Sequence, residues 1–158
     1  IRLSLVGSEM CIRDSFQSKG YQEFRFMSNF YAAPFSVGPA LYPTVEHYYQ
    51  ASKATNMDDF RHVMAATTPG EAMRRGRSIQ TPLSWEHMKI EVMTRACRMK
   101  FEQNTDLKEM LLATEGFELV EYAPWGDTFW GVGKDYVGQN NLGIILMQVR
   151  TELKERTK

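Results

Sequence analysis

The chain has 158 residues, 43% of them apolar and 12% aromatic, which is enough for one domain with a substantial core. Basic and acidic residues number 19 each, so the net charge is zero, which excludes a general electrostatic attraction to nucleic acid or acidic membranes. Two cysteines make neither a disulfide framework nor a zinc cluster, and a cytoplasmic location is predicted. No apolar run approaches the roughly 20 residues that span a bilayer.

The first 15 residues, IRLSLVGSEMCIRDS, need separate treatment. They lack a basic segment followed by an apolar one, so they do not form a signal peptide. They resemble translated sequencing-adapter sequence, which indicates a non-native segment; the alternative is a flexible tail. Residues 16–158 are predicted to form one domain.

Short elements are predicted first along the chain. Residues 24–42 favour short extended pieces, with a hairpin at Gly38-Pro39. Thr44 is expected to cap a helix over about 45–55, and a second short helix is expected within 57–66.

Longer helices are predicted in the rest of the chain. Thr68, Pro69 and Gly76 are predicted to be the cap, first residue and stop of one helix. The longest, within 84–103, is predicted to bury an apolar stripe of Trp85, Met88, Val92 and Ala96, with Met93, Cys97 and Phe101 beside it. A helix ending at Gly116, a strand within 117–123 and a last helix burying Leu142, Ile145, Leu146, Val149 and Leu153 follow. These elements predict a compact, helix-rich α+β fold with a small sheet.

The stretch YPTVEHYYQASKA contains the first candidate site. Glu46, Gln50 and Lys53 are spaced to lie along one face of a helix. A carboxylate and an amine facing a cleft suit acid/base chemistry and nucleophilic or anion-binding chemistry. The same spacing also fits a solvated stripe, with Glu46 stabilised by the helix dipole.

Two further stretches are candidates for binding. In PWGDTFWGVGKD, Trp125, Phe129 and Trp130 surround Asp127, which suits stacking on a planar base or a loop pinned to the core. The arginines of MRRGR suit phosphate recognition or an exposed helix end: Arg74, Arg75 and Arg77. The three histidines lack metal-ligand spacing, and the glycine-rich segment before the last helix is neither a P-loop nor a dinucleotide fingerprint.

Six motifs, in order and spacing, resemble the YbiA-like NADAR family over residues 16–156. They are FMSNFYAAPFSV, YPTVEHYYQASKA, GRSIQ…W, KFEQNTDLKEMLLAT, DTFWGVG and GQNNLGIILMQVR. The resemblance implies a compact α+β domain that hydrolyses ribosyl N-glycosidic bonds. Two substrate classes are implied, phosphoribosyl-amino-pyrimidine intermediates of riboflavin synthesis and guanine bases in nucleic acid that carry ADP-ribose.

The resemblance also implies roles for individual residues. Glu46 is expected to be the acid/base and Lys53 the nucleophile or, if it stays charged, a phosphate ligand. Asp127 completes the catalytic group by positioning ribose hydroxyls, together with Asn29, while Trp130 stacks the base. His47 and Asn141 are the other substrate-binding residues that the resemblance implies, and the MRRGR pattern adds Arg74 and Arg77 as residues expected to bind phosphate. No metal or cofactor is expected, and a non-catalytic binder of ADP-ribose or a related nucleotide is the alternative.

Overall fold

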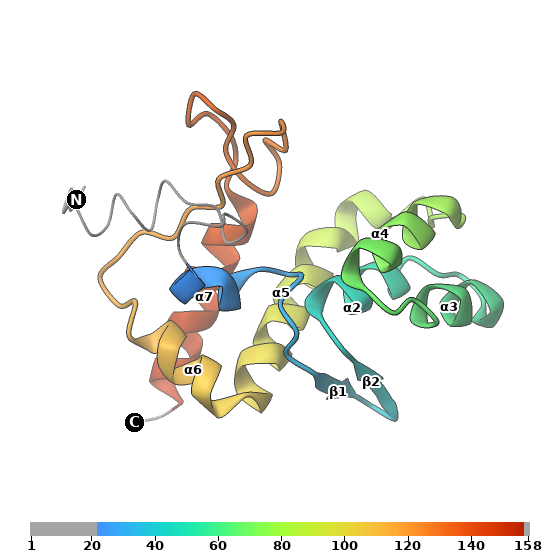
Figure 1. The fold of residues 1–158 in the computed structure, drawn as a ribbon, viewed down its shortest axis with the longest axis horizontal. Helices are drawn as coiled ribbons and strands as arrows, with labels where there is room; N and C mark the ends of the chain where they lie inside the picture. Colours follow the sequence, from blue (N-terminus) through green and yellow to red (C-terminus); the bar gives the residue numbers. More distant parts are fainter. Residues whose placement is uncertain (1–21, 157–158) are drawn as a thin grey trace. The chain divides into compact units, whose positions relative to one another are not determined.

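A computed structural model describes residues 22–156, so the prediction for residues 1–15 falls outside the described part. The chain divides into two compact units (Figure 1). The central unit is Asn29–Asn104. The terminal unit combines Ile1–Ser28 with Thr105–Lys158, of which 22–28 and 105–156 are described. That residues 16–158 form one domain stays a prediction.

The central unit begins with a hairpin. Strands β1 (Phe35–Val37) and β2 (Ala40–Tyr42) pair antiparallel, with Phe35 opposite Tyr42. Gly38 takes the left-handed conformation, φ 58°, at the turn, which glycine adopts without steric cost. The predicted hairpin is therefore confirmed.

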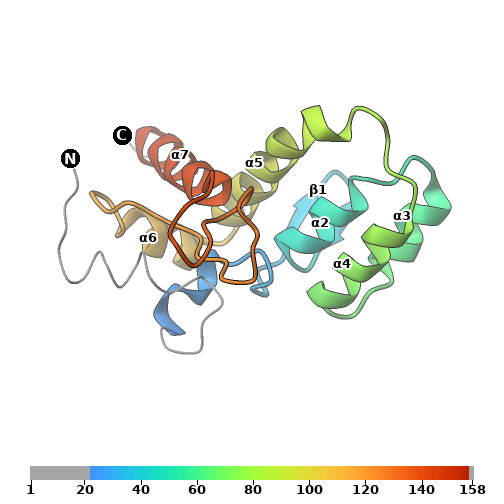
Figure 2. The same cartoon turned by 90° about the horizontal axis from the view of Figure 1, so that it is seen from above.

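The helices of the central unit surround a fully buried one. All seven residues of α2 (Val45–Ala51) are buried, and α2 packs against α4, α5 and α3 (Figure 2). These neighbours are α3 (Met57–Met64), α4 (Pro69–Ser78) and α5 (Trp85–Gln103). Because α2 has no solvated face, any polar side chain it carries is enclosed by its neighbours.

The terminal unit is built on two helices, α6 (Thr105–Leu112) and α7 (Asn141–Glu155), which pack together. The apolar stripe predicted for the last helix is buried as expected. A 3-10 helix, η1 (Gln22–Met27), occupies part of the segment for which extended pieces were predicted, so that prediction is wrong there.

The prediction of a strand within 117–123 is also wrong. The segment makes one isolated parallel bridge, between Tyr122 and Val132. The side chain of Asn140 replaces a strand partner, because its Oδ1 accepts from the Glu121 N–H at 2.9 Å and its Nδ2 donates to the Leu119 carbonyl at 2.9 Å. A side chain therefore pairs the backbone where a strand was expected.

Three local predictions in the central unit are corrected. Helix α2 ends at Ala51 rather than near 55, and the Ser52 hydroxyl donates to the Tyr48 carbonyl at 2.8 Å. Gly76 lies buried inside α4 and does not stop it. Met88 is 42% exposed, so the buried stripe of α5 passes instead through Trp85, Met93, Ala96, Cys97 and Phe101.

The described residues form an α+β fold of packed helices with a two-stranded sheet, as predicted. Among residues 22–156, no helix combines the length and the apolar character needed to cross a membrane.

Candidate functional site

Glu46 is a buried carboxyl group in the first turn of α2. Thr44 caps the helix through a hydrogen bond from the His47 N–H to its hydroxyl. Glu46 is 6% exposed, and its Oε1 accepts a 2.6 Å hydrogen bond from Gln50 Nε2. Oε2 accepts no hydrogen bond from the described residues. Burial raises the pKa of Glu46, while the Gln50 hydrogen bond, Lys53 and Arg77 act in the opposite direction.

Lys53 lies on the turn that follows α2, where its backbone N–H bonds the Gln50 carbonyl at 3.2 Å. Its Nζ is 5.3 Å from the ring centre of Tyr49 and 5.7 Å from that of Trp85, both buried rings. Burial lowers the pKa of Lys53. The charge of Glu46 acts against this, Arg77 lowers the pKa further and Glu86 raises it.

Glu46 and Lys53 influence each other without forming an ion pair within the described residues. Burial displaces both pKa values toward the neutral forms, an acid that holds its proton and an amine that releases it. Oppositely displaced titratable groups at one place are typical of acid/base sites. The structure therefore places a buried acid in the first turn of one short helix and a half-buried amine on the turn that follows that helix.

Asn29, from the segment before the hairpin, contacts the first turn of α2. Its backbone carbonyl accepts from the Glu46 N–H at 3.1 Å, and its side-chain Nδ2 contacts the Met93 sulfur at 3.5 Å. Its Oδ1 is buried without a hydrogen-bond partner. A buried carbonyl-type oxygen of this kind is an acceptor that a substrate hydroxyl or N–H can use.

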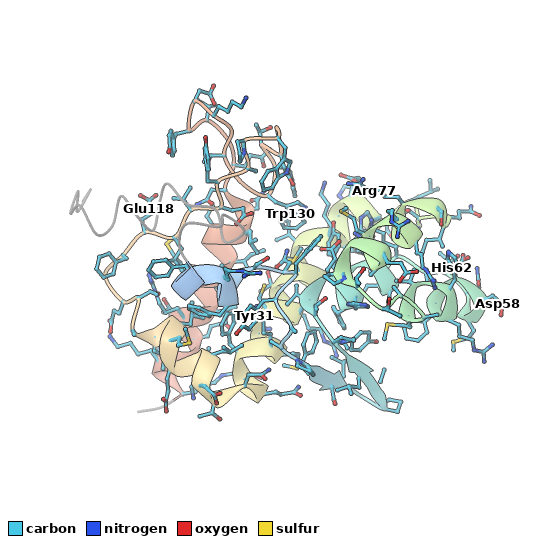
Figure 3. All side chains as sticks on the ribbon, in the orientation of Figure 1. Tyr31, Asp58, His62, Arg77, Glu118 and Trp130 are labelled. Atoms are coloured by element: carbon cyan, nitrogen blue, oxygen red, sulfur yellow. The ribbon has the colours of Figure 1, made fainter. Side chains whose placement is uncertain are left out.

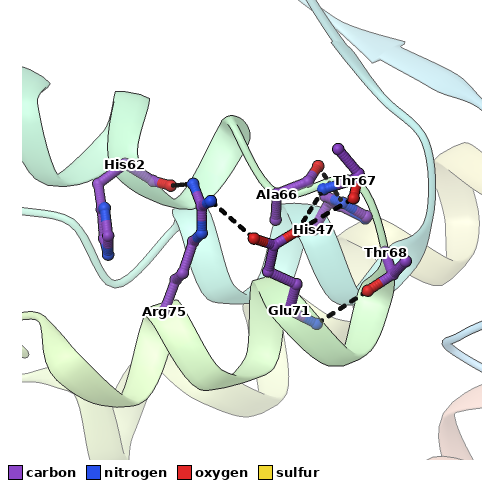
Figure 4. A network of polar contacts seen from close by, with 7 residues as sticks. All are labelled: His47, His62, Ala66, Thr67, Thr68, Glu71 and Arg75. Atoms are coloured by element: carbon purple, nitrogen blue, oxygen red, sulfur yellow. Dashed lines mark hydrogen bonds and ion pairs between the residues drawn. The ribbon is translucent and has the colours of Figure 1, made fainter.

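His47 has both ring nitrogens occupied inside the central unit, and Figure 4 shows the Ala66 partner of Nε2. Nε2 lies 3.2 Å from the Ala66 carbonyl, which can only accept, so Nε2 carries the proton. Nδ1, 2.8 Å from the Thr44 hydroxyl, is then the acceptor. Burial lowers the pKa of His47, with a partly opposing contribution from the Ala66 bond. His47 thus holds α2 to the segment before α4.

The three arginines of α4 differ in their partners. Arg75 donates to Glu71 at 2.7 Å and to the His62 carbonyl at 2.6 Å (Figure 4). Arg74 and Arg77 are exposed, and Figure 3 labels Arg77 near the end of α4. Arg77 acts on the pKa of both Glu46 and Lys53, which associates it with this site.

The remaining predicted residues belong to the terminal unit. Asp127 Oδ1 accepts from the N–H groups of Phe129 and Trp130 at 3.2 and 2.9 Å, which holds the aromatic loop in a turn. Trp130, labelled in Figure 3, is half-buried and packs edge-on against Phe129, with ring centres 4.9 Å apart. Asn141 Nδ2 donates to the Phe129 carbonyl at 2.8 Å. All three therefore shape the loop that carries Trp130.

Two residues that shape the surroundings of Glu46 were given no functional role by the sequence-based prediction. Gln50 lies one turn after Glu46, a spacing that the sequence shows, but the amide contact itself requires coordinates. Gly76 was interpreted as a helix stop. A Cβ built on Gly76 would lie 2.8 Å from both Cβ and Cδ of Gln50, so its role is to give that side chain space.

Comparisons with known proteins agree on one family. The model of the NADAR domain matches residues 15–154. The N-glycosidase YbiA of Escherichia coli K12 is 38% identical over 154 residues, covering 96% of this chain and 94% of that protein. An N-glycosidase of Nostoc punctiforme is 38% identical over 141 residues, covering 86% of this chain and 90% of that protein.

A solved structure is also similar. The NMR structure of the E. coli protein YbiA has a TM-score of 0.80 and 36% sequence identity, and the match covers 91% of this chain and 84% of that chain. A riboflavin biosynthesis protein of Vibrio vulnificus is 42% identical over 132 residues, which cover 82% of this chain and 36% of that protein.

Proposed function

Because the chain belongs to the NADAR domain family, we propose that it is an N-glycosidase that hydrolyses a ribosyl C1′–N bond. Relatives that match nearly the whole chain are named N-glycosidases. The observation that carries the proposal is the pairing of Glu46 and Lys53, a buried acid and a half-buried amine whose pKa values burial displaces toward the neutral forms.

Glu46 is the proposed acid/base. Cleavage of a C1′–N bond passes through an oxocarbenium-like state, as glycoside hydrolysis does. The bonding electron pair leaves with the base nitrogen, which needs a proton. A buried carboxyl group with a raised pKa is suited to supply that proton.

Lys53 is the proposed nucleophile. The lone pair of its neutral amine forms a bond to C1′ as the base departs, and ring opening with proton transfer to the ring oxygen gives a Schiff base. Water then adds to C1′, and release of the amine regenerates Lys53 and the free sugar. The lowered pKa supports this role, since only the neutral amine is nucleophilic.

The finer assignments belong to the same proposal. Asn29 Oδ1 accepts from a ribose hydroxyl, and Asp127 positions another; Trp130 stacks on the base. Arg77, with Arg74, binds phosphate. Asn141 shapes the Trp130 loop, and His47 acts through α2 rather than on the substrate, since its nitrogens are occupied.

The proposed substrate is either a phosphoribosyl-amino-pyrimidine of riboflavin synthesis or an ADP-ribosylated guanine in nucleic acid. We propose that the protein acts on it in the cytoplasm. Incubation with both substrate types, followed by separation of the products, decides between them. A purely binding module for ADP-ribose would need neither the acid nor the amine, so release of free sugar from either substrate rules it out.

Substitutions test the two roles separately. Glu46→Gln keeps size and hydrogen bonding but lacks the carboxylic proton, and turnover should fall about 10²–10⁴-fold with binding retained. Lys53→Ala should abolish an adduct trapped by borohydride. Lys53→Arg should bind substrate without turnover. Normal turnover in Lys53→Arg, with no trapped adduct in the parent, would leave Lys53 as a phosphate ligand and water as the nucleophile.

A further inference from the structure

Gln50 is a residue of α2 to which the proposed chemistry gives no role. It is 4% exposed, and its Nε2 donates to Glu46 Oε1 at 2.6 Å. Its Oε1 is buried and has no hydrogen-bond partner. Buried amides normally satisfy both ends, so an unpaired oxygen beside the proposed acid calls for an explanation.

The chemistry of the two groups supplies one. An ionised carboxylate only accepts hydrogen bonds, whereas a carboxylic acid has an O–H to donate. A side-chain amide carries a donor and an acceptor, and a half-turn about its terminal torsion exchanges them. Nε2 therefore matches ionised Glu46, and after the half-turn Oε1 matches protonated Glu46. An acid/base group passes through both forms in each turnover.

The amide has space because position 76 lacks a side chain. A Cβ on Gly76 would lie 2.8 Å from Cβ and Cδ of Gln50 and would overlap Oε1. Gly76 lies within α4, where glycine is less favourable than alanine because its backbone loses more conformational freedom. Gly70, in the same helix, has nothing within 4 Å of its built Cβ. The glycine at 76 is thus needed for the contact with Gln50, while the one at 70 is not.

We propose that Gln50 is a positioning residue of the acid/base group, whose amide pairs with Glu46 in both protonation states and more strongly with the charged carboxylate, and that Gly76 provides the room this requires. The inference rests on the proposed function, because a carboxyl that never changes protonation needs no such partner.

Other charges act on Glu46 as well. Lys53, on the turn after α2, and Arg77, from α4, both favour its ionised form, while Glu86 of α5 acts on Lys53. Since the hydrogen bond from Gln50 also lowers the pKa of Glu46, its removal should raise that pKa further. This direction can be measured without substrate.

The experiment compares Gln50→Met, Gly76→Ala and the matched control Gly70→Ala with the parent chain. Methionine keeps the length of glutamine without its polar atoms, and alanine at 76 displaces the amide. Carbon-13 NMR titration of the Glu46 carboxyl, assigned by its loss in Glu46→Gln, gives one readout. The pH profile of kcat/KM gives the other.

Both test variants should raise the Glu46 titration midpoint by roughly one pH unit. The limb of the pH profile that disappears in Glu46→Gln should shift to higher pH together with the titration midpoint. The kcat should fall roughly tenfold, with KM nearly unchanged. Gly70→Ala should match the parent in both readouts.

Two outcomes would overturn the inference, and they differ in what they leave standing. An unchanged titration in Gln50→Met would show that Gln50 does not position Glu46. The proposed function would still stand, because the Glu46→Gln variant tests it separately. A shifted titration with an unchanged pH profile would show that Glu46 is not the acid/base, so both would fail. If Gly76→Ala does not fold, Gln50→Met alone decides.

Discussion

Glu46 lowers the stability of the folded chain at neutral pH because burial disfavours its ionised form. Its folded pKa lies above the unfolded value of 4.5, so the folded chain binds this proton more tightly. The resulting stabilisation is fully present below pH 4.5 and is lost as the pH rises through the folded pKa. The same burial that suits the group to donate a proton therefore costs stability at working pH.

We expect Glu46→Gln to be at least as stable as the parent chain at neutral pH while losing turnover. Glutamine can keep an amide contact with Gln50 and carries no charge to bury. The difference in melting temperature, variant minus parent, should grow as the pH rises from about 4.5, by about 2–4 °C for each kcal/mol recovered. Calorimetry between pH 5 and 8 measures it. A difference that does not grow with pH would show that burial does not raise this pKa.

The candidate residues near α2 were found from sequence because their signals are local. A threonine cap, a first-turn acid and a lysine seven positions on define Glu46 and Lys53 without reference to any other element. Trp85, Glu86 and Gly76 act on these groups from α4 and α5, through contacts that no spacing within a single helix encodes. Their contribution could not be predicted from the sequence.

Among helix ends and strands too, features with local causes were predicted from the sequence, and features that depend on distant residues were not. The Thr44 and Thr68 caps are present as predicted, since a cap involves residues only three apart. The early end of α2 accompanies a bond from the Ser52 hydroxyl to a helix carbonyl, a competition that serine offers at many positions. The missing strand at 117–123 reflects pairing by Asn140, about twenty residues away.

Asn140→Asp should therefore destabilise the terminal unit. Asn140 has a left-handed backbone, φ 52°, which aspartate tolerates, so backbone strain stays small. Aspartate can still accept from the Glu121 N–H but cannot donate to the Leu119 carbonyl. The free energy of unfolding should fall by about 1–3 kcal/mol.

Urea denaturation measures this loss. Gln80→Glu is the control, because Gln80 is exposed and its amide makes no hydrogen bond with the described residues. Equal stability of the two variants would show that Asn140 does not hold the 119–121 segment.

Equal numbers of basic and acidic side chains leave the chain without an excess charge to attract a polyanion. Recognition of the proposed ribosylated substrate must then depend on a few placed cations. The described structure offers Arg77, which acts on both Glu46 and Lys53, and the exposed Arg74. The zero net charge predicts that binding depends only weakly on salt concentration, and the placed arginines predict which substitutions reduce that dependence.

For a nucleic-acid-linked substrate, log Kd should change with log salt with a shallow slope, corresponding to about one or two phosphate contacts. Arg77→Gln and Arg74→Gln should each weaken binding and reduce the slope by about one. Arg61→Gln, an exposed arginine on α3, is the control. Fluorescence anisotropy at several salt concentrations measures these slopes. A steep slope that no α4 variant changes would place the phosphate contacts elsewhere in the chain.

The fit of Gln50 against Gly76 also constrains how this chain can diverge. A larger residue at 76 collides with glutamine at 50, and a shorter side chain at 50 removes the overlap with Oε1 and Cδ but keeps a Cβ 2.8 Å from the built Cβ. Neither single step away from the pair is neutral, because one clashes and the other deprives Glu46 of its partner. Among descendants of a common ancestor, glycine at 76 should therefore accompany glutamine at 50.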